Sequence, residues 1–548
     1  MAARTWTGLG ADANWSTALN WDGGASVPAT TDSVTFDATG AAFPCTIDAL
    51  GTWSGGTLTI DAAYLNTITQ SSGINVNCAA FSQASGTFTG HSAATFTSTT
   101  FSVTGGVFAQ GGAFVSTTFT VGAGTYTGSS ATMASTTVTL NSASGNVTAT
   151  SGTWTVSSTW NASAALTWNA NGGTVFWSGG SSVTVTAANT PFNLVQINWS
   201  TNTLSLASGT FPLGANPTTN MGVGSLSITG TVTWSGTWSM NTGANFTTNS
   251  GAVLTGTSSP RLVLSGSVTI HASSTLTNPV STITLVSGGT RTYTDTGDKF
   301  SAATIIIGDG SVKNLTIAAS TICRLGTNPT SSMGTGTLTV TGTLNVSGSW
   351  THTGSLTLTA TTGTVTGALT AFNCGEGAIT FNAGSAWPNG VNLNWTPTSS
   401  TARTFALNGE TFGTFRRIGS ASAHLTITGS NTFATFRDND GLVAHTIKFK
   451  DGATQTAGAW FLAGSPGKTL TLDTDTGAGT FTLAKTGGGE VRASYCSITR
   501  STVDASPIWT ADPSCTNGGG NTNWIFGSVY FDQARQRKRG RRWIPLVA

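Results

Sequence analysis

Apolar and polar residues alternate in short runs along most of the chain, and glycine-rich corners separate the runs. Three of these runs share a Ser-Thr-Thr triplet that begins at Ser98, Ser116 and Ser135, which gives steps of 18 and 19 residues. Shorter alternating pieces, such as Gly86-Thr-Phe-Thr and Gly124-Thr-Tyr-Thr, lie between them. Alternation with a period of two predicts β-strands. A period near 20 without helical segments predicts a β-solenoid, in which each coil stacks on the previous one.

A longer duplication favours one continuous array of coils. Residues 213–238 (Leu-Gly-Ala-Asn-Pro-Thr-Thr-Asn-Met-Gly and onward) match residues 325–350 with an offset of 112 residues throughout. This offset corresponds to about five or six coils of ~20 residues each. Residues 60–500 then hold ~22 coils, and at ~4.8 Å per coil we expect a rod on the order of 100 Å long.

Composition supports an all-β chain. Thr, Val, Ile, Phe and Trp favour strands, whereas the strong helix formers Glu, Lys, Gln, Arg and Met are scarce. Low complexity and 8% charged residues are typical of disorder, but the chain also contains 18 Trp and 26 Phe. A chain that never buried its side chains would not carry so many apolar rings.

Formal charge is missing from a very long stretch. Residues 62–260 contain no Asp, Glu, Lys or Arg in 199 positions, and His91 is the single histidine among them. Most enzyme chemistry needs ionisable groups placed against each other, so this stretch predicts a scaffold. Stacking explains the low charge, because a charged position would lie ~4.8 Å from its copies in neighbouring coils and repel them.

Both ends of the chain differ from this body. Trp6, Trp15 and Trp21 are expected to cover the first coil as a lid, since an open β edge recruits other chains. A sugar-binding aromatic platform is the alternative for these three rings. We therefore expect an elongated parallel β-helix with capped ends, organised as a Trp-rich cap (residues 1–60), a body with the duplication (61–440), C-terminal coils and a cap (441–527) and a basic tail (528–548).

The ends also carry a resemblance to known proteins. The N-terminal pattern is Trp6-Thr-Gly, Asn14-Trp-Ser and Asn20-Trp-Asp-Gly, followed by Pro28 and Asp32-Ser-Val-Thr-Phe. It resembles the start of right-handed parallel β-helix proteins of phage virions and bacterial surfaces. The C-terminal segments are similar to theirs: His445-Thr-Ile-Lys-Phe-Lys-Asp-Gly, Ala493-Ser-Tyr-Cys-Ser-Ile-Thr and Asn517-Gly-Gly-Gly-Asn-Thr-Asn-Trp-Ile-Phe. The resemblance implies the fold more than the role, since such helices serve adhesins, fibres and lyases.

Acidic residues outside the uncharged stretch are candidates for chemistry. Asp473 and Asp475 would lie on one face of a strand, and polysaccharide-cleaving β-helices use carboxylate pairs. The segment 437–441, Arg-Asp-Asn-Asp-Gly, resembles a loop that holds Ca²⁺. For both features a solvated turn or strand edge is the preferred interpretation, so we expect no catalytic residue, metal or cofactor and no enzyme activity.

Other reactive side chains are interpreted as structural. The cysteines are expected as buried thiols, and pairing of Cys496 with Cys515 stays open. A tryptophan-rich band is expected to fill the core, with a glycan-binding stripe as the alternative; it comprises Trp154, Trp160, Trp168, Trp177 and Trp199. The histidines stand apart from one another and are expected at the surface or at coil edges: His91, His271, His352, His424 and His445.

The C-terminal tail holds the one strong cluster of charge. The net charge of +2 includes its six basic residues, so the rest of the chain carries −4. A solvated tail, an anchor on a partner protein and a nucleic-acid contact are the three interpretations, with nucleic acid the least favoured. The candidate partner-binding residues are Arg535, Arg537, Lys538, Arg539, Arg541, Arg542 and Trp543.

These features together favour a structural virion protein of a bacteriophage. It would act as a rigid rod for display or adhesion, as a fibre, spike or capsid decoration, with other capsid or tail proteins as partners. A homotrimer and a glycan ligand stay open. The opening residues contain no apolar h-region, and the chain has no apolar run of 18 residues, so we expect synthesis in a host cytoplasm and no membrane contact. A bacterial surface adhesin or extracellular filament subunit is the alternative, and a polysaccharide depolymerase is the second alternative.

Overall fold

Stacked parallel strands form the fold, as the alternation of apolar and polar residues predicts. The computed structural model is an all-β parallel β-solenoid of about 22 turns. It describes residues 2–24, 26–162, 165–188, 190–241, 243–277, 280–286, 290–299, 304–307, 314–327, 329–332, 336–353, 357–382 and 384–527. The chain divides into two units, residues 1–282 and 283–548.

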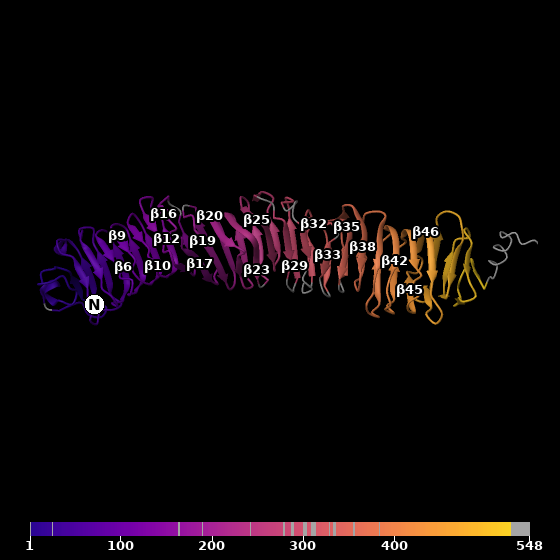
Figure 1. Cartoon of the computed structure of the whole chain (residues 1–548), viewed down its shortest axis with the longest axis horizontal. Coiled ribbons are helices and arrows are strands. Elements are labelled where there is room, and N and C mark those ends of the chain that lie inside the picture. The colour runs from indigo at the N-terminus through magenta and orange to yellow at the C-terminus, as the bar shows by residue number, and fades with distance from the viewer. Residues whose placement is uncertain are drawn as a thin grey trace, which may run out of the picture. The chain divides into compact units, whose positions relative to one another are not determined.

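In the first unit the coils stack through a long parallel sheet. Figure 1 shows successive coils of this unit following one another from β6 and β10 to β25. The strands of this sheet are β1 (Ala3–Thr5), β2 (Ser33–Phe36), β4 (Thr57–Ile60), β6 (Val76–Gln83), β8 (Phe96–Val103), β10 (Phe114–Val121), β12 (Met133–Leu140), β14 (Thr153–Val156), β15 (Trp160–Asn161), β17 (Thr174–Gly179), β18 (Val183–Ala187), β19 (Leu194–Trp199), β20 (Thr203–Ala215), β21 (Thr218–Asn220), β22 (Ser225–Ile228), β23 (Thr231–Asn241), β24 (Asn245–Thr248), β25 (Val253–Leu264), β26 (Val268–Ile270), β27 (Thr275–Thr277) and, at the unit boundary, β28 (Thr282–Leu285).

A second parallel sheet of seven strands forms another side of the same coils. Its strands are β3 (Cys45–Ile47), β5 (Thr67–Gln70), β7 (Thr87–Thr89), β9 (Val107–Ala109), β11 (Thr125–Thr127), β13 (Asn146–Thr148) and β16 (Thr167–Asn169). Tight corners join the two sheets. Gly86 and Gly106 occupy such corners with φ of 60° and 66°, a region that favours glycine.

Register in the first unit follows the sequence repeat. Ser116 of β10 pairs with Ser98 of β8 on one side and with Ser135 of β12 on the other, so the Ser-Thr-Thr triplets stack in register. Side chains that point inward therefore contact the equivalent side chains of the neighbouring coils. Phe101 stacks between Phe81 and Phe119, with ring centroids 5.1 and 5.2 Å away. The uncharged ladder thus gains van der Waals and ring contacts at every step.

Three tryptophans close the N-terminal end of the first unit. Trp6, Trp15 and Trp21 are at most 1% exposed, and all three pack around Phe36 of β2. Short 3-10 turns hold this segment, η1 (Ala18–Asn20), η2 (Asp22–Gly24) and η3 (Ala38–Gly40). Within the described ranges, no helix has the length and apolar character needed to span a membrane.

The second unit is built from parallel strands in the same way. One ladder contains β29 (Thr290–Asp295), β30 (Thr304–Ile307), β31 (Asn314–Ile317), β34 (Thr337–Val340), β36 (Thr357–Ala360), β39 (Ile379–Phe381), β41 (Arg403–Ala406), β43 (Leu425–Thr428), β45 (His445–Phe449), β47 (Leu470–Thr474), β50 (Cys496–Ile498) and β53 (Thr516–Asn517). Another contains β32 (Ile322–Thr327), β33 (Thr330–Ser332), β35 (Thr343–Thr353), β37 (Thr364–Thr366), β38 (Leu369–Cys374), β40 (Val391–Trp395), β42 (Thr411–Arg417), β44 (Thr432–Asp438), β46 (Thr454–Ala463), β48 (Phe481–Lys485), β49 (Val491–Ser494), β51 (Ser501–Val503), β52 (Trp509–Ala511) and β54 (Trp524–Phe526).

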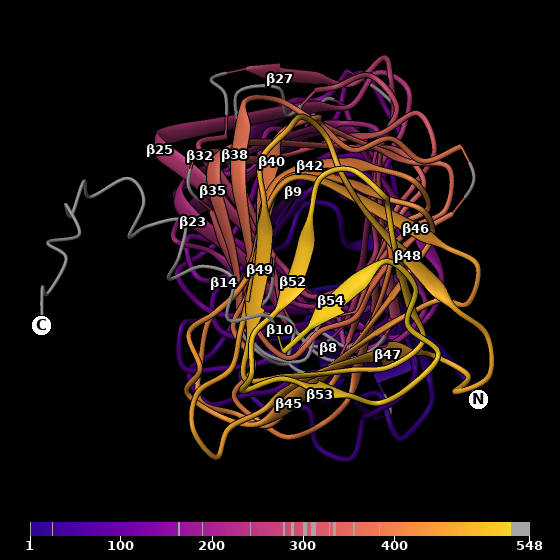
Figure 2. The same ribbon diagram turned by 90° about the vertical axis from the view of Figure 1, so that its right-hand side faces the viewer.

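The C-terminal coils of the second unit enclose a core of rings. Seen end-on in Figure 2, β46, β48, β52 and β54 run around a common interior. Trp460, Trp509 and Trp524 succeed one another in that interior, with ring centroids 5.9 and 5.4 Å apart. These apolar contacts between coils supply the main stabilising term of a solenoid.

The duplicated segments have the same internal geometry. In the first unit, the indole Nε1 of Trp238 donates to the hydroxyl of Thr219 at 2.9 Å. In the second unit, Nε1 of Trp350 donates to the hydroxyl of Ser331, also at 2.9 Å. Both pairs keep the offset of 112 residues. The repeat in sequence is thus a repeat in structure.

Candidate functional site

The candidate partner-binding residues of the tail lie outside the described residues; they are Arg535, Arg537, Lys538, Arg539, Arg541, Arg542 and Trp543. Their role stays a prediction from sequence. Side chains within residues 2–527 supply the remaining candidates.

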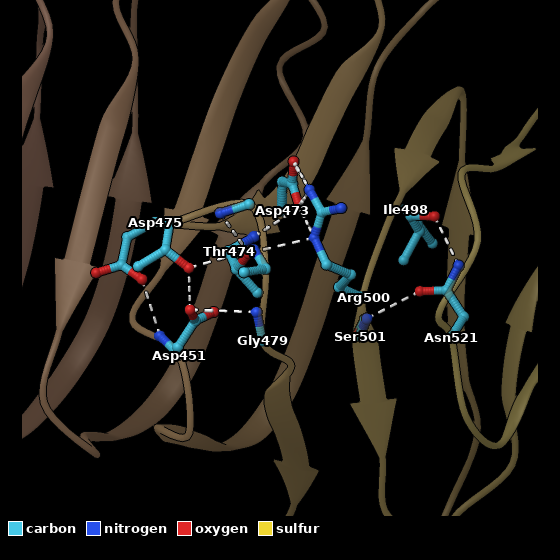
Figure 3. Close-up of polar contacts among 12 residues, drawn as sticks. Asp451, Asp473, Thr474, Asp475, Gly479, Ile498, Arg500, Ser501 and Asn521 are labelled. Atoms are coloured by element: carbon cyan, nitrogen blue, oxygen red, sulfur yellow. Dashed lines mark hydrogen bonds and ion pairs between the residues drawn. The ribbon is translucent and has the colours of Figure 1, made fainter.

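The acidic residues Asp473 and Asp475 lie at one corner of the C-terminal coils. β47 buries Leu470, Leu472 and Thr474, so Asp473 and the next odd position, Asp475, point outward together as the alternation predicts. Figure 3 shows the corner, where charged and polar side chains of successive coils meet. The outward placement meets the first requirement for a carboxylate pair.

Arg500 of the following coil neutralises Asp473. Its Nε donates to Oδ1 of Asp473 at 3.1 Å, and its Nη2 donates to Oδ2 at 2.8 Å. This two-point contact fixes both oxygens of the carboxylate. Both side chains keep about a quarter of their surface exposed, so the pair contributes about 1 kcal/mol or less to stability.

Asp475 and Asp451 are also occupied by protein donors. The backbone N–H of Asp451 donates to Asp475 at 2.9 Å, and the Asp451 carboxylate accepts from the Thr476 hydroxyl and from the Gly479 N–H. The hydrogen bond from Thr476 lowers the pKa of Asp451, so this carboxylate is ionised near neutral pH and is not a general acid.

The same corner continues into the last coil. Asn521 accepts from the N–H of Ser501 at 2.9 Å and donates to the carbonyl of Ile498 at 2.6 Å (Figure 3). Each polar group therefore links its own coil to the next one. The arrangement is that of a polar staple along the stack. Each of its three carboxylates accepts at least one hydrogen bond, whereas Oδ1 of Asp451 is buried without a partner.

The acidic residues of the loop 437–441, which resembles a Ca²⁺ loop in sequence, contact side chains of the protein. Asp440 faces the buried Arg417, with 3.6 Å between Oδ1 and Nη1, and it accepts from the Gly419 N–H at 3.2 Å. Asp438 is buried and contacts His445 at 2.7 Å. Among the described residues, no group of three or more His, Cys, Asp or Glu side chains could hold a metal ion.

The histidines are expected at the surface or at coil edges, and two of them are instead buried. His352 and His445 are only 4% and 3% exposed. His445 places Nδ1 2.9 Å from the carbonyl of Val443 and Nε2 2.7 Å from Asp438. Because a carbonyl only accepts, Nδ1 is the donor to Val443. Both imidazole nitrogens therefore have a partner, whereas Oδ1 of Asp438 is buried without one.

His352 is buried with less compensation. Its Nδ1 lies 2.7 Å from the Ser331 hydroxyl, whereas Nε2 is buried without a hydrogen-bond partner. Burial lowers the pKa of His352 to about 4, so the ring is neutral at pH 7. In strand β35 this imidazole occupies an inward position that the alternation also assigns to Trp350.

The expectation of buried thiols is confirmed for five of the six cysteines, and all six are free thiols. The buried ones are Cys45, Cys78, Cys323, Cys374 and Cys496, whereas Cys515 is half-buried. The N–H of Cys496 lies 3.4 Å from the sulfur of Cys515, on neighbouring coils. A hydrogen bond from Cys496 lowers the pKa of the Cys515 thiol.

The tryptophan-rich band belongs to the core, as expected. Trp154, Trp160, Trp177 and Trp199 are at most 1% exposed. Trp168 is half-buried, and its Nε1 donates to the carbonyl of Pro191 at 2.8 Å. A glycan-binding stripe made of these rings is therefore wrong.

A hollow on the outer side of the first unit is a feature that sequence reasoning missed. β19 pairs with β17 along its whole length, but its described pairing with β21 is confined to Asn198 with Asn220. The chain leaves the ladder shortly before β21, where the pairing of β20 with β23 shifts register between Pro212 and Ala215. The open space between the strands has a volume of about 480 Å³.

Local backbone geometry creates this hollow. Gly214 has a φ of 78°, and a Cβ there would lie 2.8 Å from Cδ1 of Leu194. The next residues turn to the following coil, because the N–H of Asn216 donates to Ser235 and the N–H of Ser239 donates to Pro217, both at 2.9 Å. Sequence did carry one signal. Phe176 and Trp177 are adjacent in a strand, so one of the two rings must face outward.

Comparison with known proteins gives no relative. The chain matches no protein-family model, and neither the curated proteins nor the solved structures contain a similar one.

Proposed function

We propose that this protein is a structural component of a bacteriophage virion, as a fibre, spike or capsid decoration, and that it acts by rigid display. The observation that carries the proposal is the in-register ladder of uncharged coils. Equivalent serines of successive strands stack in register, namely Ser98, Ser116 and Ser135. Equivalent inward rings stack in the same way, namely Phe81, Phe101 and Phe119. In the C-terminal coils Asp473 and Arg500 join one coil to the next, which supports a structural role.

Several details support a role in display. The Trp lid covers the first coil, which keeps its edge from recruiting other chains. The polar staple around Asp473 and Arg500 ties the C-terminal coils together. The function of such a protein then depends on what its ends attach to, and the basic tail is the candidate anchor.

A bacterial surface adhesin or filament subunit is the second candidate. The outward-facing side chains of the seven-stranded sheet favour it. Thr67 pairs with Thr87 and Thr69 pairs with Thr89, and no outward position from β5 to β16 carries a formal charge. An uncharged hydroxyl-rich face can pack against its own copy without charge repulsion. Genes for capsid and tail proteins beside this gene would favour the virion, and genes for export machinery the surface protein.

Co-sedimentation tests the virion proposal. Particles from cells that express the full chain are separated on a density gradient, and the chain is quantified against the major capsid protein. We expect a constant ratio across the particle fractions. Recovery of the chain only in the slow, particle-free fractions would refute the proposal.

A tail variant tests the anchor in the same gradient. All six basic residues of the tail are changed to glutamine, and the matched control changes the exposed Lys450 and Lys468 to glutamine. We expect the tail variant to leave the particle fractions and the control to stay. Retention of both variants would place the anchor elsewhere on the chain.

A further inference from the structure

We propose that the hollow between β19 and β21 binds a neutral oligosaccharide. This inference does not depend on the proposed function, because a chain that never joins a particle would keep the hollow. Its volume of about 480 Å³ lies within the roughly 300–1,000 Å³ of small-molecule sites.

Polar groups in the hollow suit a ligand rich in hydroxyls. Leu194, Gln196 and Asn198 project outward from β19, where they alternate with buried Val195 and Ile197. Thr218 projects outward from β21 opposite them, and Asn216 stands at the turn that opens the hollow. An amide offers both donors and an acceptor, and a hydroxyl both donates and accepts, so Gln196, Asn198 and Thr218 can pair with the vicinal hydroxyls of a sugar. Asn216 can do so through its NH₂ group, because its Oδ1 accepts from the N–H of Thr237 at 2.9 Å.

Apolar groups line the same hollow beside the amides. Phe176 of β17 pairs with Gln196 and is half-buried on the outer side of its strand, while its neighbour Trp177 fills the core. Leu194 also lines the hollow. The face of an aromatic ring carries negative charge, which attracts the C–H groups of a pyranose ring. Amide side chains beside an apolar ring thus match the two kinds of surface that a sugar presents.

Absence of charge restricts the class of ligand. The hollow lies within the stretch from residue 62 to residue 260, which has no Asp, Glu, Lys or Arg. A charged ligand would lose hydration there without gaining a counter-charge, at a cost of several kcal/mol for a buried ion. A neutral ligand avoids that cost.

An added peptide strand fits the hollow less well. The side of β19 that faces the hollow is free of described strand pairing only from Leu194 to Ile197, and the pairing of Asn198 with Asn220 closes it. A strand in a protein usually has about five or six residues. The unpaired edge of β19 is therefore too short for a typical strand, whereas a short ligand with many hydroxyls fits it.

Binding measurements on the full chain test the proposal. The probes are neutral tetrasaccharides of glucose, galactose, mannose and N-acetylglucosamine, with tetragalacturonate as the charged counterpart and a Ser/Thr-rich octapeptide as the strand counterpart. Saturation-transfer NMR detects binding, and isothermal titration calorimetry gives Kd. We expect saturable binding of at least one neutral tetrasaccharide and of neither counterpart.

Variants connect that binding to the hollow. We expect F176A and Q196A each to weaken binding about tenfold or more, as the loss of one good contact does. The matched controls are F461A, which removes a phenylalanine that is 45% exposed in the second unit, and N77A, which removes an exposed amide on β6. Both controls should bind as the parent chain does. Unchanged thermal unfolding of F176A and Q196A excludes misfolding as the cause.

Three results would overturn the proposal. The first is the absence of saturable binding for all neutral tetrasaccharides. The second is binding of tetragalacturonate or of the octapeptide alone. The third is equal weakening by the controls, because binding would then lie outside the hollow.

Discussion

Replacing Phe101 with alanine tests whether stacked rings hold the coils together. The side chain is fully buried in β8, between Phe81 and Phe119, and its ring planes lie within 11° of theirs. Two further rings, Phe108 and Phe114, meet it edge-on with centroids 4.8 Å away. One substitution therefore removes contacts to the coil before and the coil after.

The expected loss is large for a single side chain. Replacing a buried phenylalanine with alanine costs about 3–5 kcal/mol, and aromatic pairs add about 0.5–1.5 kcal/mol each beyond the buried area. With Phe96 and Tyr126 at 6.0 and 6.1 Å, six rings contact Phe101, and they place its loss at the upper end of that range, at about 4–5 kcal/mol. Because a solenoid unfolds locally, this loss falls on the coils next to the substitution and not evenly on the chain.

Hydrogen exchange followed by mass spectrometry measures that local loss. We expect amides of β6, β8 and β10 to exchange roughly a thousandfold faster in F101A, since each 1.4 kcal/mol is about a factor of ten. F461A is the control. Its ring is 45% exposed and 5.5 Å from the guanidinium of Arg437, so it should cost about 1 kcal/mol or less. An increase below about tenfold in F101A would refute the stacking argument.

Three other predictions concern the second unit. The pKa of His352 is about 4 in the folded chain against its usual 6.5, so the unfolded chain binds a proton first as pH falls. The free energy of unfolding, measured with urea, should therefore drop by about 3 kcal/mol between pH 6.5 and pH 4. The variant H352Q should show a flatter pH dependence. Glutathione disulfide should oxidise Cys496 and Cys515 to a disulfide, the two thiols losing two protons and two electrons to it. Cys496 and Cys515 directly precede the paired residues Ser497 and Thr516, and the N–H of Cys496 lies 3.4 Å from the sulfur of Cys515. Peptide mapping should show a mass loss of about 2 Da that C515S abolishes. D473N should lower stability by only about 1 kcal/mol, because the ion pair that it breaks is partly exposed. A loss above about 3 kcal/mol in chemical denaturation would contradict this estimate for the Asp473–Arg500 pair.

The strands and their register follow from sequence where the repeat is clean. Ser98, Ser116 and Ser135 stack as their spacing predicts, because a step of one residue would turn every ring from the core to solvent. Inward positions are predicted in the same way, since apolar residues alternate with Thr and Ser along each strand. The burial of Trp154 and Trp177 follows from this rule.

Sequence reasoning fails where the structure departs from simple stacking. The surface expectation for His352 and His445 rests on their isolation in sequence, but the partners that make them acceptable in the core, Ser331 and Asp438, come from other strands. The hollow depends on a register shift near Gly214, which no local pattern specifies. Composition and alternation predict the regular coil that the repeat shares. The hollow arises where one coil departs from that regular geometry.

Electron cryomicroscopy of purified particles tests the central proposal most directly. Particles from cells expressing the full chain, decorated with an antibody fragment against the solenoid, are compared with undecorated particles. We expect density for the fragment at fixed, symmetry-related positions on the particle, with the solenoid between the fragment and the particle surface. Particles without such density, while the same fragment captures the chain free in solution, would contradict it.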